Sequence, residues 1–232
     1  ASCLVGSEMC IRDSINCYLS LQKDELMFFD EYQIEKLEKI YRVNLMNSCS
    51  GYKSANLIGT ISKNGQYNLA VFSSIVHLGS NPPLLGFFLR PTEVVPRHTY
   101  LNIKEKEFYT INSIDKLNFD KAHHTSAKYP RDISEFDITG IKPKITTNFP
   151  APFVDSSSIK IGMKFVEEIK IKHNRSRLIV GKIVCLDVKD EMLNNDGFID
   201  LYKSQIATIS GCDGYSFPET NERKGYQKPR KV

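Results

Sequence analysis

Asn56-Leu-Ile-Gly-Thr-Ile-Ser62 and Tyr67-Asn-Leu-Ala-Val-Phe-Ser-Ser-Ile-Val76 are two strand-like runs, and Lys63-Asn-Gly-Gln66 joins them. Asn-Gly between β-prone runs is the strongest short-range signal of a hairpin, because both residues tolerate the backbone angles of a tight turn. The stretch therefore predicts an antiparallel hairpin, from which the rest of the sheet can be built.

Further strand-like runs follow the hairpin. After the break at Asn81-Pro-Pro83 they occupy residues 84–90, 107–112, 164–173, 177–188 and 198–201. Helices are expected at 30–49, 99–103 and 117–128, with N-caps at Asp30, Thr99 and Asn118, and the proline-rich residues 129–163 are expected to be irregular. Six or seven strands without regular β-α alternation favour a mainly β fold, an antiparallel sheet closed into a barrel, over a doubly wound sheet.

Residues 1–26 do not fit this pattern. They lack the basic start and the long apolar core of a secretory signal, and their apolar residues follow no period. The segment resembles a translated sequencing adapter followed by upstream sequence, which makes Met27 the expected natural start. We therefore expect a non-native head at 1–26 and a single domain at 27–232, with a floppy native N-terminus as the alternative.

The composition of the 232 residues is that of an ordinary globular protein. The formal net charge is +4, and +6 without the head, which is too little to make nucleic acid the expected partner. No apolar run reaches the ~18 residues of a membrane-spanning helix, so no membrane partner is expected. The scattered cysteines beyond the head favour a reducing compartment and a cytoplasmic protein: Cys49, Cys185 and Cys212.

Common catalytic signatures are missing from the sequence. It contains no G-x-S-x-G, P-loop, H-E-x-x-H or G-x-G-x-x-G. His123 and His124 are the only adjacent histidines, and neighbouring helical residues point about 100° apart, so the two are not expected to share one metal ion. We favour a packed or surface pair, with a place at the mouth of a substrate site as the alternative. No catalytic residue and no metal ligand is predicted.

Short polar side chains on the two hairpin strands suggest ligand binding: Thr60, Ser62, Asn68, Ser73 and Ser74. Hydroxyl and amide groups beside exposed backbone amides can bind a polyhydroxyl chain and the edge of a heteroaromatic ring. Pro96-Arg-His-Thr99 opens a short helix, where a guanidinium and a hydroxyl make a phosphate site. The alternative is that the hydroxyls bond across the sheet and the arginines cover it as solvated charges.

Several segments, taken in order, resemble the FMN-binding split-barrel family of flavin reductases. They are 53–60, 65–74, Asn81-Pro-Pro83, 97–103, 122–126, Ser134-Glu-Phe136, Thr139-Gly-Ile141 and 179–184. Each segment is short, but their order and spacing extend the resemblance over about residues 42–228. The resemblance implies an antiparallel split β-barrel of Greek-key type with a few peripheral helices, FMN as the cofactor, and a homodimer with flavin near its interface.

The resemblance also implies a role for each polar residue. Residues that would border the flavin and its ribityl chain are Gly59 and Thr60; those that would read the isoalloxazine edge are Asn68, Ala70, Phe72, Ser73 and Ser74; those that would hold the phosphate are Arg97 and Thr99, with Arg90 and Lys53 as weaker candidates. The chain departs from the family pattern twice. Many relatives have Lys-Asp-Thr in place of Arg97-His98-Thr99, and Val71 replaces a proline, which puts the local backbone in doubt.

The implied function is that of an oxidoreductase that passes hydride from NADH or NADPH to flavin N5 and on to an unidentified acceptor. A non-catalytic FMN carrier or electron-transfer protein without a nicotinamide site is the first alternative. A decayed site, or a different ligand in the same cleft, is another. A basic β-barrel that binds an oligonucleotide is the remaining one, and the small net charge gives it little support.

Overall fold

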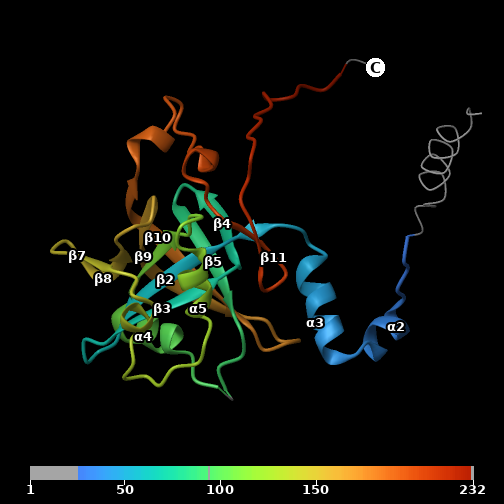
Figure 1. Cartoon of the computed structure of the whole chain (residues 1–232), viewed down its shortest axis with the longest axis horizontal. Coiled ribbons are helices and arrows are strands. Elements are labelled where there is room, and N and C mark those ends of the chain that lie inside the picture. The colour runs from blue at the N-terminus through green and yellow to red at the C-terminus, as the bar shows by residue number, and fades with distance from the viewer. Residues whose placement is uncertain (1–25, 94, 231–232) are drawn as a thin grey trace, which may run out of the picture. The chain divides into compact units, whose positions relative to one another are not determined.

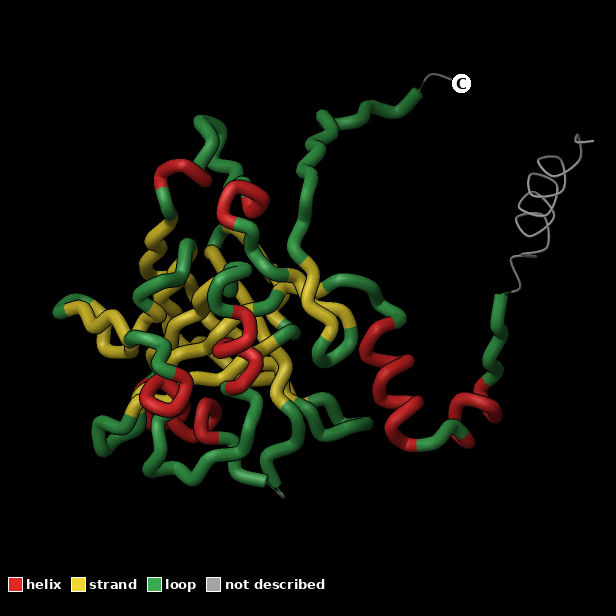
Figure 2. Tube along the Cα trace, viewed as in Figure 1, coloured by secondary structure: helices red, strands yellow, loops and turns green. Residues whose placement is uncertain are grey.

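The computed structural model describes residues 26–93 and 95–230, and apart from Leu26 the head predicted at 1–26 lies outside them. The chain divides into two compact units, Ala1–Val43 and Asn44–Val232. The described strands all lie in the larger unit, where Figure 2 shows short helices around them. The helices are α2 (Glu31–Lys36), α3 (Lys39–Ser48), α4 (His98–Lys106), α5 (Phe119–His124) and α6 (Glu135–Thr139), with 3-10 turns at Asp190–Met192 and Leu201–Ser204.

Helices α2 and α3 replace the single helix predicted at 30–49. Asp30 starts α2 with a capping box, as its sequence predicts, because Asp30 and Gln33 each accept from the other's backbone N–H. Leu37 then leaves the helical conformation with ψ 140°. The Glu38 carboxylate accepts from two backbone N–H groups of the first turn of α3. The prediction of one helix is wrong because Glu38 caps a second one.

Seven strands form one antiparallel sheet in the order β3-β2-β6-β9-β10-β5-β4. Figure 1 labels β2, β3, β4, β5, β9 and β10 of this sheet. Its strands are β2 (Asn56–Ile61), β3 (Tyr67–Phe72), β4 (Ile75–Ser80), β5 (Pro83–Leu89), β6 (Phe108–Ser113), β9 (Ile159–Lys170) and β10 (Arg177–Val188). Smaller sheets are formed by β1 (Lys53–Ser54), β11 (Thr208–Ser210) and β12 (Gly214–Ser216), and by β7 (Pro143–Thr146) and β8 (Phe149–Val154). The prediction of a mainly β, antiparallel fold is confirmed.

The seven-stranded sheet is rolled up. Its two edge strands, β3 and β4, are joined by only Ser73 and Ser74. Six strand spacings in a flat sheet span roughly 29 Å, whereas the chain from Phe72 to Ile75 reaches at most about 11 Å. The rings of Phe72 on β3 and Phe87 on β5 lie 5.1 Å apart between centroids, although five spacings separate their strands. Among the described residues no ladder joins β3 to β4, so the rolled sheet stays open along these two edges.

The predicted strand at 67–76 is therefore two strands. The β-prone run continues through Ser73 and Ser74, but the chain turns there from one edge of the sheet to the other. Residues 129–163, expected to be irregular, contain α6, β7, β8 and the start of β9. The strand predicted at 198–201 is absent from the described elements, and only Ile199 forms an isolated bridge.

The two largest hydrophobic cores of the described residues lie on the two faces of the rolled sheet. Inside the roll, strands β2, β5, β6, β9 and β10 and helix α4 contribute Ile58, Phe87, Leu89, Ile103, Tyr109, Ile111, Met163 and Ile179. Outside, α5, α6 and β8 pack over β2 and β3 through a second group that includes Leu57, Leu69, Ala122, Phe136 and Val154. The interior core therefore seats α4 on the inner face of the hairpin strands, where the candidate site begins.

Gly59 lets β8 approach β2. A Cβ at this position would overlap the Pro152 carbonyl oxygen and lie 2.6 Å from Thr110 Oγ1. The same Thr110 hydroxyl donates to the Pro152 carbonyl at 2.7 Å, so the contact is hydrogen-bonded as well as close.

None of the helices in the described part of the chain is both long and apolar enough to cross a membrane.

Candidate functional site

The start of α4 holds the two residues predicted to bind phosphate. Arg97 is the N-cap residue, with φ −114° and ψ 104°, and its side chain makes no capping bond. Thr99 lies inside the first turn, so its prediction as the cap is wrong. The first N–H groups of an α-helix have no intrahelical acceptor and form the positive end of the helix dipole. The backbone at this point therefore favours an anion.

The Arg97 side chain adds a cationic donor to this helix start. Its Nε is buried and has no hydrogen-bond partner among the described residues. A buried N–H that lacks a partner is uncommon, because its desolvation is not compensated. An anion seated between Arg97 and the free N–H groups of α4 would supply the missing acceptor.

Four buried polar side chains, the polar quartet, fix α4 to the hairpin strands: Thr60, Asn68, Thr99 and Asn102. Asn68 Nδ2 donates to Thr99 Oγ1 at 3.2 Å, and Asn102 Nδ2 donates to Thr60 Oγ1 at 3.0 Å. All four residues are at most 7% exposed. Because Thr99 Oγ1 accepts from Asn68, its own O–H stays available as a donor. The quartet thus sets the position of the α4 start relative to β2 and β3.

His98 stands between Arg97 and Thr99, where the family pattern has an acid. Burial, and then the positive charge of Arg131, lower the pKa of His98 from its ordinary value of 6.5. Arg131 is itself paired with Glu105 on α4 at 2.8 Å. A neutral histidine leaves the charge of Arg97 uncompensated at the helix start. An acidic side chain at position 98 would instead repel an anionic ligand.

The free edge of β3 supplies backbone donors. Leu69 N–H donates to Glu135 Oε2 at 2.9 Å, so it points away from β2. In an antiparallel strand the N–H groups alternate sides, which turns Val71 N–H outward as well and directs those of Ala70 and Phe72 toward β2. The outward donor next to the predicted ring-reading residues is therefore that of Val71.

Glu135 closes part of that edge from α6. The residue is only 5% exposed. Burial raises the pKa of its carboxyl group, against the opposing effect of its backbone hydrogen bonds, of which the one from Leu69 is the stronger. An inward-pointing carboxylate also keeps the edge of β3 from pairing with another strand.

Two other residues proposed for the site have partners elsewhere, and a third is exposed. Lys53 Nζ donates to the carbonyl oxygens of Asn47 and Gly211, each at 2.9 Å, and so holds the small β1-β11-β12 sheet. Ser74 Oγ bonds to both backbone groups of Phe88, at 3.1 and 3.2 Å, and extends the contact between β4 and β5. Arg90 is exposed just after β5.

The structure thus brings Thr60, Asn68, Arg97 and Thr99 to one place, with Ala70 and Phe72 farther along β3. Sequence reasoning missed Asn102 and Glu135. Asn102 lies three residues after Thr99, on the same helix face, and this spacing was the signal that could have found it. Glu135 lies in the Ser134-Glu-Phe136 segment of the resemblance, but its contact with Leu69 has no local signal, because it joins residues 66 positions apart.

The two histidines of α5 are packed separately. His123 Nδ1 lies 3.2 Å from Tyr215 Oη, and His124 Nε2 lies 2.6 Å from Tyr129 Oη. Each imidazole thus has its own tyrosine partner, as a packed pair requires. Among residues 26–93 and 95–230 no group of three or more His, Cys, Asp and Glu residues could hold a metal ion.

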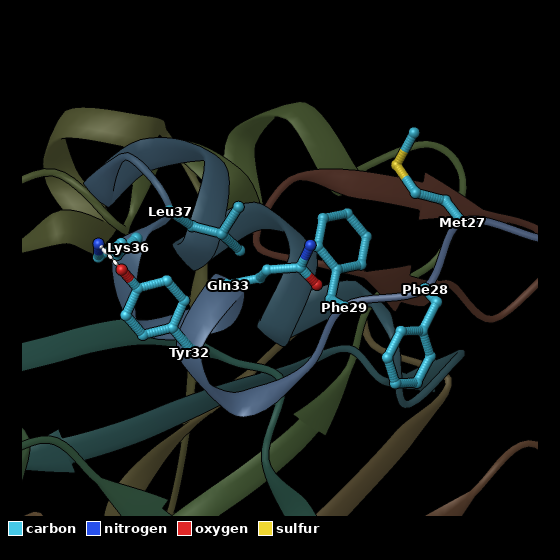
Figure 3. A pocket seen from close by; sticks show the side chains of 7 residues that line it. All are labelled: Met27, Phe28, Phe29, Tyr32, Gln33, Lys36 and Leu37. Carbon is cyan, nitrogen blue, oxygen red and sulfur yellow. Dashed lines mark hydrogen bonds between the residues drawn. The ribbon is translucent and has the colours of Figure 1, made fainter.

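Two hollows are lined by other residues than those predicted for the site. One, of about 440 Å³, belongs to the N-terminal unit, and Figure 3 shows its lining of Met27, Phe28, Phe29, Tyr32, Gln33, Lys36 and Leu37. The other, of about 320 Å³, is lined by Ile61, Tyr67 and residues 145–152. Neither includes a predicted ligand residue. The candidate site is therefore described by its residues, a helix start beside a strand edge.

Comparisons with known proteins show the family and the fold of the chain. A protein from Shewanella frigidimarina, assigned as a flavin reductase with a split barrel domain, is 42% identical, covers 87% of this chain and 100% of its own, and superposes with a TM-score of 0.83. Two structures at 16% identity share the fold. They are nitrilotriacetate monooxygenase component B from Bacillus cereus (TM-score 0.76; 86% and 99% covered) and an FMN-binding protein from Thermus thermophilus (0.61; 75% and 91%). The model of the flavin reductase like domain family matches residues 50–205, and the chain belongs to that family.

Proposed function

We propose that the protein is an FMN-dependent oxidoreductase that accepts hydride from NADH or NADPH and passes it to an acceptor. The observation that carries the proposal is the buried, unpartnered Nε of Arg97 beside the free N–H groups of α4. Membership of the flavin reductase like family supports it. So does the likeness of the fold to a protein described as FMN-binding.

The residues of the α4 start fit the phosphate end of FMN. Arg97 would bind the phosphate through its guanidinium, and Thr99 would donate its free O–H. Asn68 holds Thr99 in place through the 3.2 Å bond, so its role is to position that hydroxyl. Thr60 is fully buried and paired with Asn102, and we assign it to the support of α4 rather than to ligand contact.

The outer edge of β3 fits the ring end of FMN. Val71 N–H would donate to the polar edge of the ring, as its orientation away from β2 allows. A backbone donor aimed at that edge would stabilise negative charge that develops there. When bound, the flavin supplies the hydride chemistry itself, so no side chain of this chain is required as a general acid or base.

We also propose a homodimer. Large apolar side chains are exposed on the strands at the β4 end of the sheet: Val76, Leu78, Phe88, Val184 and Leu186. We call this group the apolar strand face. Its side chains are between 37% and 52% exposed, and a second copy of the chain would cover them. The cytoplasm stays the proposed location, because Cys49, Cys185 and Cys212 are exposed free thiols.

An absorbance spectrum under anaerobic conditions tests the proposed function. The purified protein, loaded with FMN, should show a bound-flavin spectrum that bleaches when NADH or NADPH is added. A bound flavin that stays yellow with both nucleotides would indicate an FMN carrier without a nicotinamide site. If the protein does not bind added FMN, the proposed flavin site is refuted.

A further inference from the structure

An ion pair outside the site connects strands β9 and β10 to α4 and to the loop that precedes it. Arg177, the first residue of β10, places Nη1 2.6 Å from Glu168 Oε1 on β9. The Tyr100 hydroxyl, in the first turn of α4, donates to the second carboxylate oxygen, Glu168 Oε2, at 2.9 Å. The Arg177 guanidinium also lies over the Tyr100 ring, 5.3 Å from its centroid. Both residues of the Glu168–Arg177 pair therefore contact the first turn of α4.

The same arginine holds the loop that leads into α4. Arg177 Nε donates to Thr92 Oγ1 at 3.2 Å, and Nη2 lies 3.1 Å from Glu93 Oε1. Lys170 supports the loop as well, with Nζ 3.4 Å from the Glu93 carboxylate. The contacts thus fall on both sides of Arg97: four residues before it at Glu93 and three residues after it at Tyr100.

The contacts of the pair are with the protein. Each of the three Arg177 nitrogens has a protein acceptor, and both Glu168 oxygens are engaged. The side chains are only 14% and 23% exposed, so the contacts are less screened by solvent than an open surface pair. A planar guanidinium with several fixed partners sets direction as well as distance.

We propose that Glu168 and Arg177 are positioning residues for the anion site, which hold Thr92 and Glu93 before Arg97 and Tyr100 after it, and hence set the direction of the Arg97 guanidinium. This inference rests on the proposed function, because it assigns the pair to the binding of the flavin phosphate. Among the described residues no side-chain partner orients Arg97, so the direction of its guanidinium depends on the backbone that carries it. The pair fixes that backbone at both ends.

The test compares FMN with riboflavin, which lacks the phosphate. Both are titrated against the full chain by flavin fluorescence, with Glu168→Gln in place of the wild-type residue. We expect the Kd for FMN to rise about tenfold and that for riboflavin to change less than about twofold. The matched control is Asp187→Asn, which breaks the exposed 3.3 Å pair with Lys144 at the other end of β10 and should alter neither Kd.

A double variant separates positioning from general weakening of the fold. If the pair acts through Arg97, adding Glu168→Gln to Arg97→Ala leaves the Kd for FMN at the value of Arg97→Ala alone. Losses that multiply, or an equal loss of FMN and riboflavin in Glu168→Gln, would overturn the inference. Arg177→Lys, which keeps the charge and loses the fork, gives the same comparison if Glu168→Gln fails to fold. Equal affinity of the wild type for both flavins would instead refute the phosphate site itself.

Discussion

At the scale of single residues, Arg97 matters most to the proposed site. Replacing it with alanine removes a charge-assisted bond to the phosphate, and such bonds contribute about 1.5–3 kcal/mol. The Kd for FMN should therefore rise about 10- to 100-fold while that for riboflavin stays nearly constant. Arg223→Ala is the control, since this exposed arginine pairs with Asp196, is no candidate for the site and should change either Kd less than about twofold. Equal losses for both flavins in Arg97→Ala would refute its role.

Glu135 gives a second prediction at this scale, in the pH dependence of stability. Burial raises the pKa of its carboxyl group above the ordinary 4.5, so the fold binds its proton more tightly than the unfolded chain does. Its contribution to stability is then present in full below pH 4.5 and is lost as pH rises through the folded pKa. Glu135→Gln keeps an oxygen for Leu69 N–H and cannot ionise, so its advantage over the wild type should grow from pH 4.5 upward.

Urea unfolding of both proteins at pH 4.5 and at pH 7.5 measures this difference. The free energy of unfolding of Glu135→Gln, relative to the wild type, should be higher at the upper pH. A relative value that falls with pH would mean that the carboxylate is stabilised in the fold, which would contradict the effect of burial.

At the scale of elements, sequence period predicts strands well where both ends have turns. The strand predicted at 177–188 has the same bounds as β10. Turn residues stand directly before Arg177, between β9 and β10, and mark where the strand begins. The division of 67–76 into β3 and β4 could not be predicted from the sequence, since Ser73 and Ser74 continue a β-prone run. The chain turns there because the rolled sheet brings its two edges together. β8 was missed because its prolines argue against a central strand, whereas it pairs only with β7.

The candidate site divides in the same way. Residue types and spacing indicated Thr60, Asn68, Arg97 and Thr99, since polar side chains in apolar strands and a cation at a helix start are local signals. That three of them bond within a buried quartet could not be predicted, because the partners lie 31 and 42 positions apart in the chain. The same holds for the position of Lys53, whose partner Gly211 is 158 residues away.

Gly59 provides the prediction for elements. An added Cβ would overlap the Pro152 carbonyl oxygen, so Gly59→Ala must push β8 away from β2 or strain the strand. We expect a loss of about 1–3 kcal/mol in the free energy of unfolding, measured in urea. Gly79→Ala in β4 is the control, because its Cβ would meet Pro82 O at 3.4 Å, close to ordinary contact. Equal free energies of unfolding of the two variants would contradict this expectation and show that β8 moves away from β2 without a loss of stability.

At the scale of the whole molecule, the rolled sheet leaves apolar side chains uncovered at its β4 end. The inner face is filled by the interior core, and the outer face over β2 and β3 is covered by α5, α6 and β8. The apolar strand face lies on β4, β5 and β10 and has no such cover among the described residues, since Leu78 and Leu186 are 43% and 52% exposed. Apolar side chains gathered on neighbouring strands differ from a single exposed leucine, which needs no explanation.

A charge on this face should therefore break the proposed dimer. Leu78→Lys places a cation where a second copy would bring apolar side chains, and desolvating it there is unfavourable. Sedimentation velocity should find a dimer for the wild type and a monomer for Leu78→Lys, with circular dichroism unchanged. Leu117→Lys is the control, because Leu117 is 92% exposed outside this face and its change should leave the dimer intact. If Leu78→Lys remains dimeric, the two copies meet through a different surface, and the exposed strands must be covered in another way.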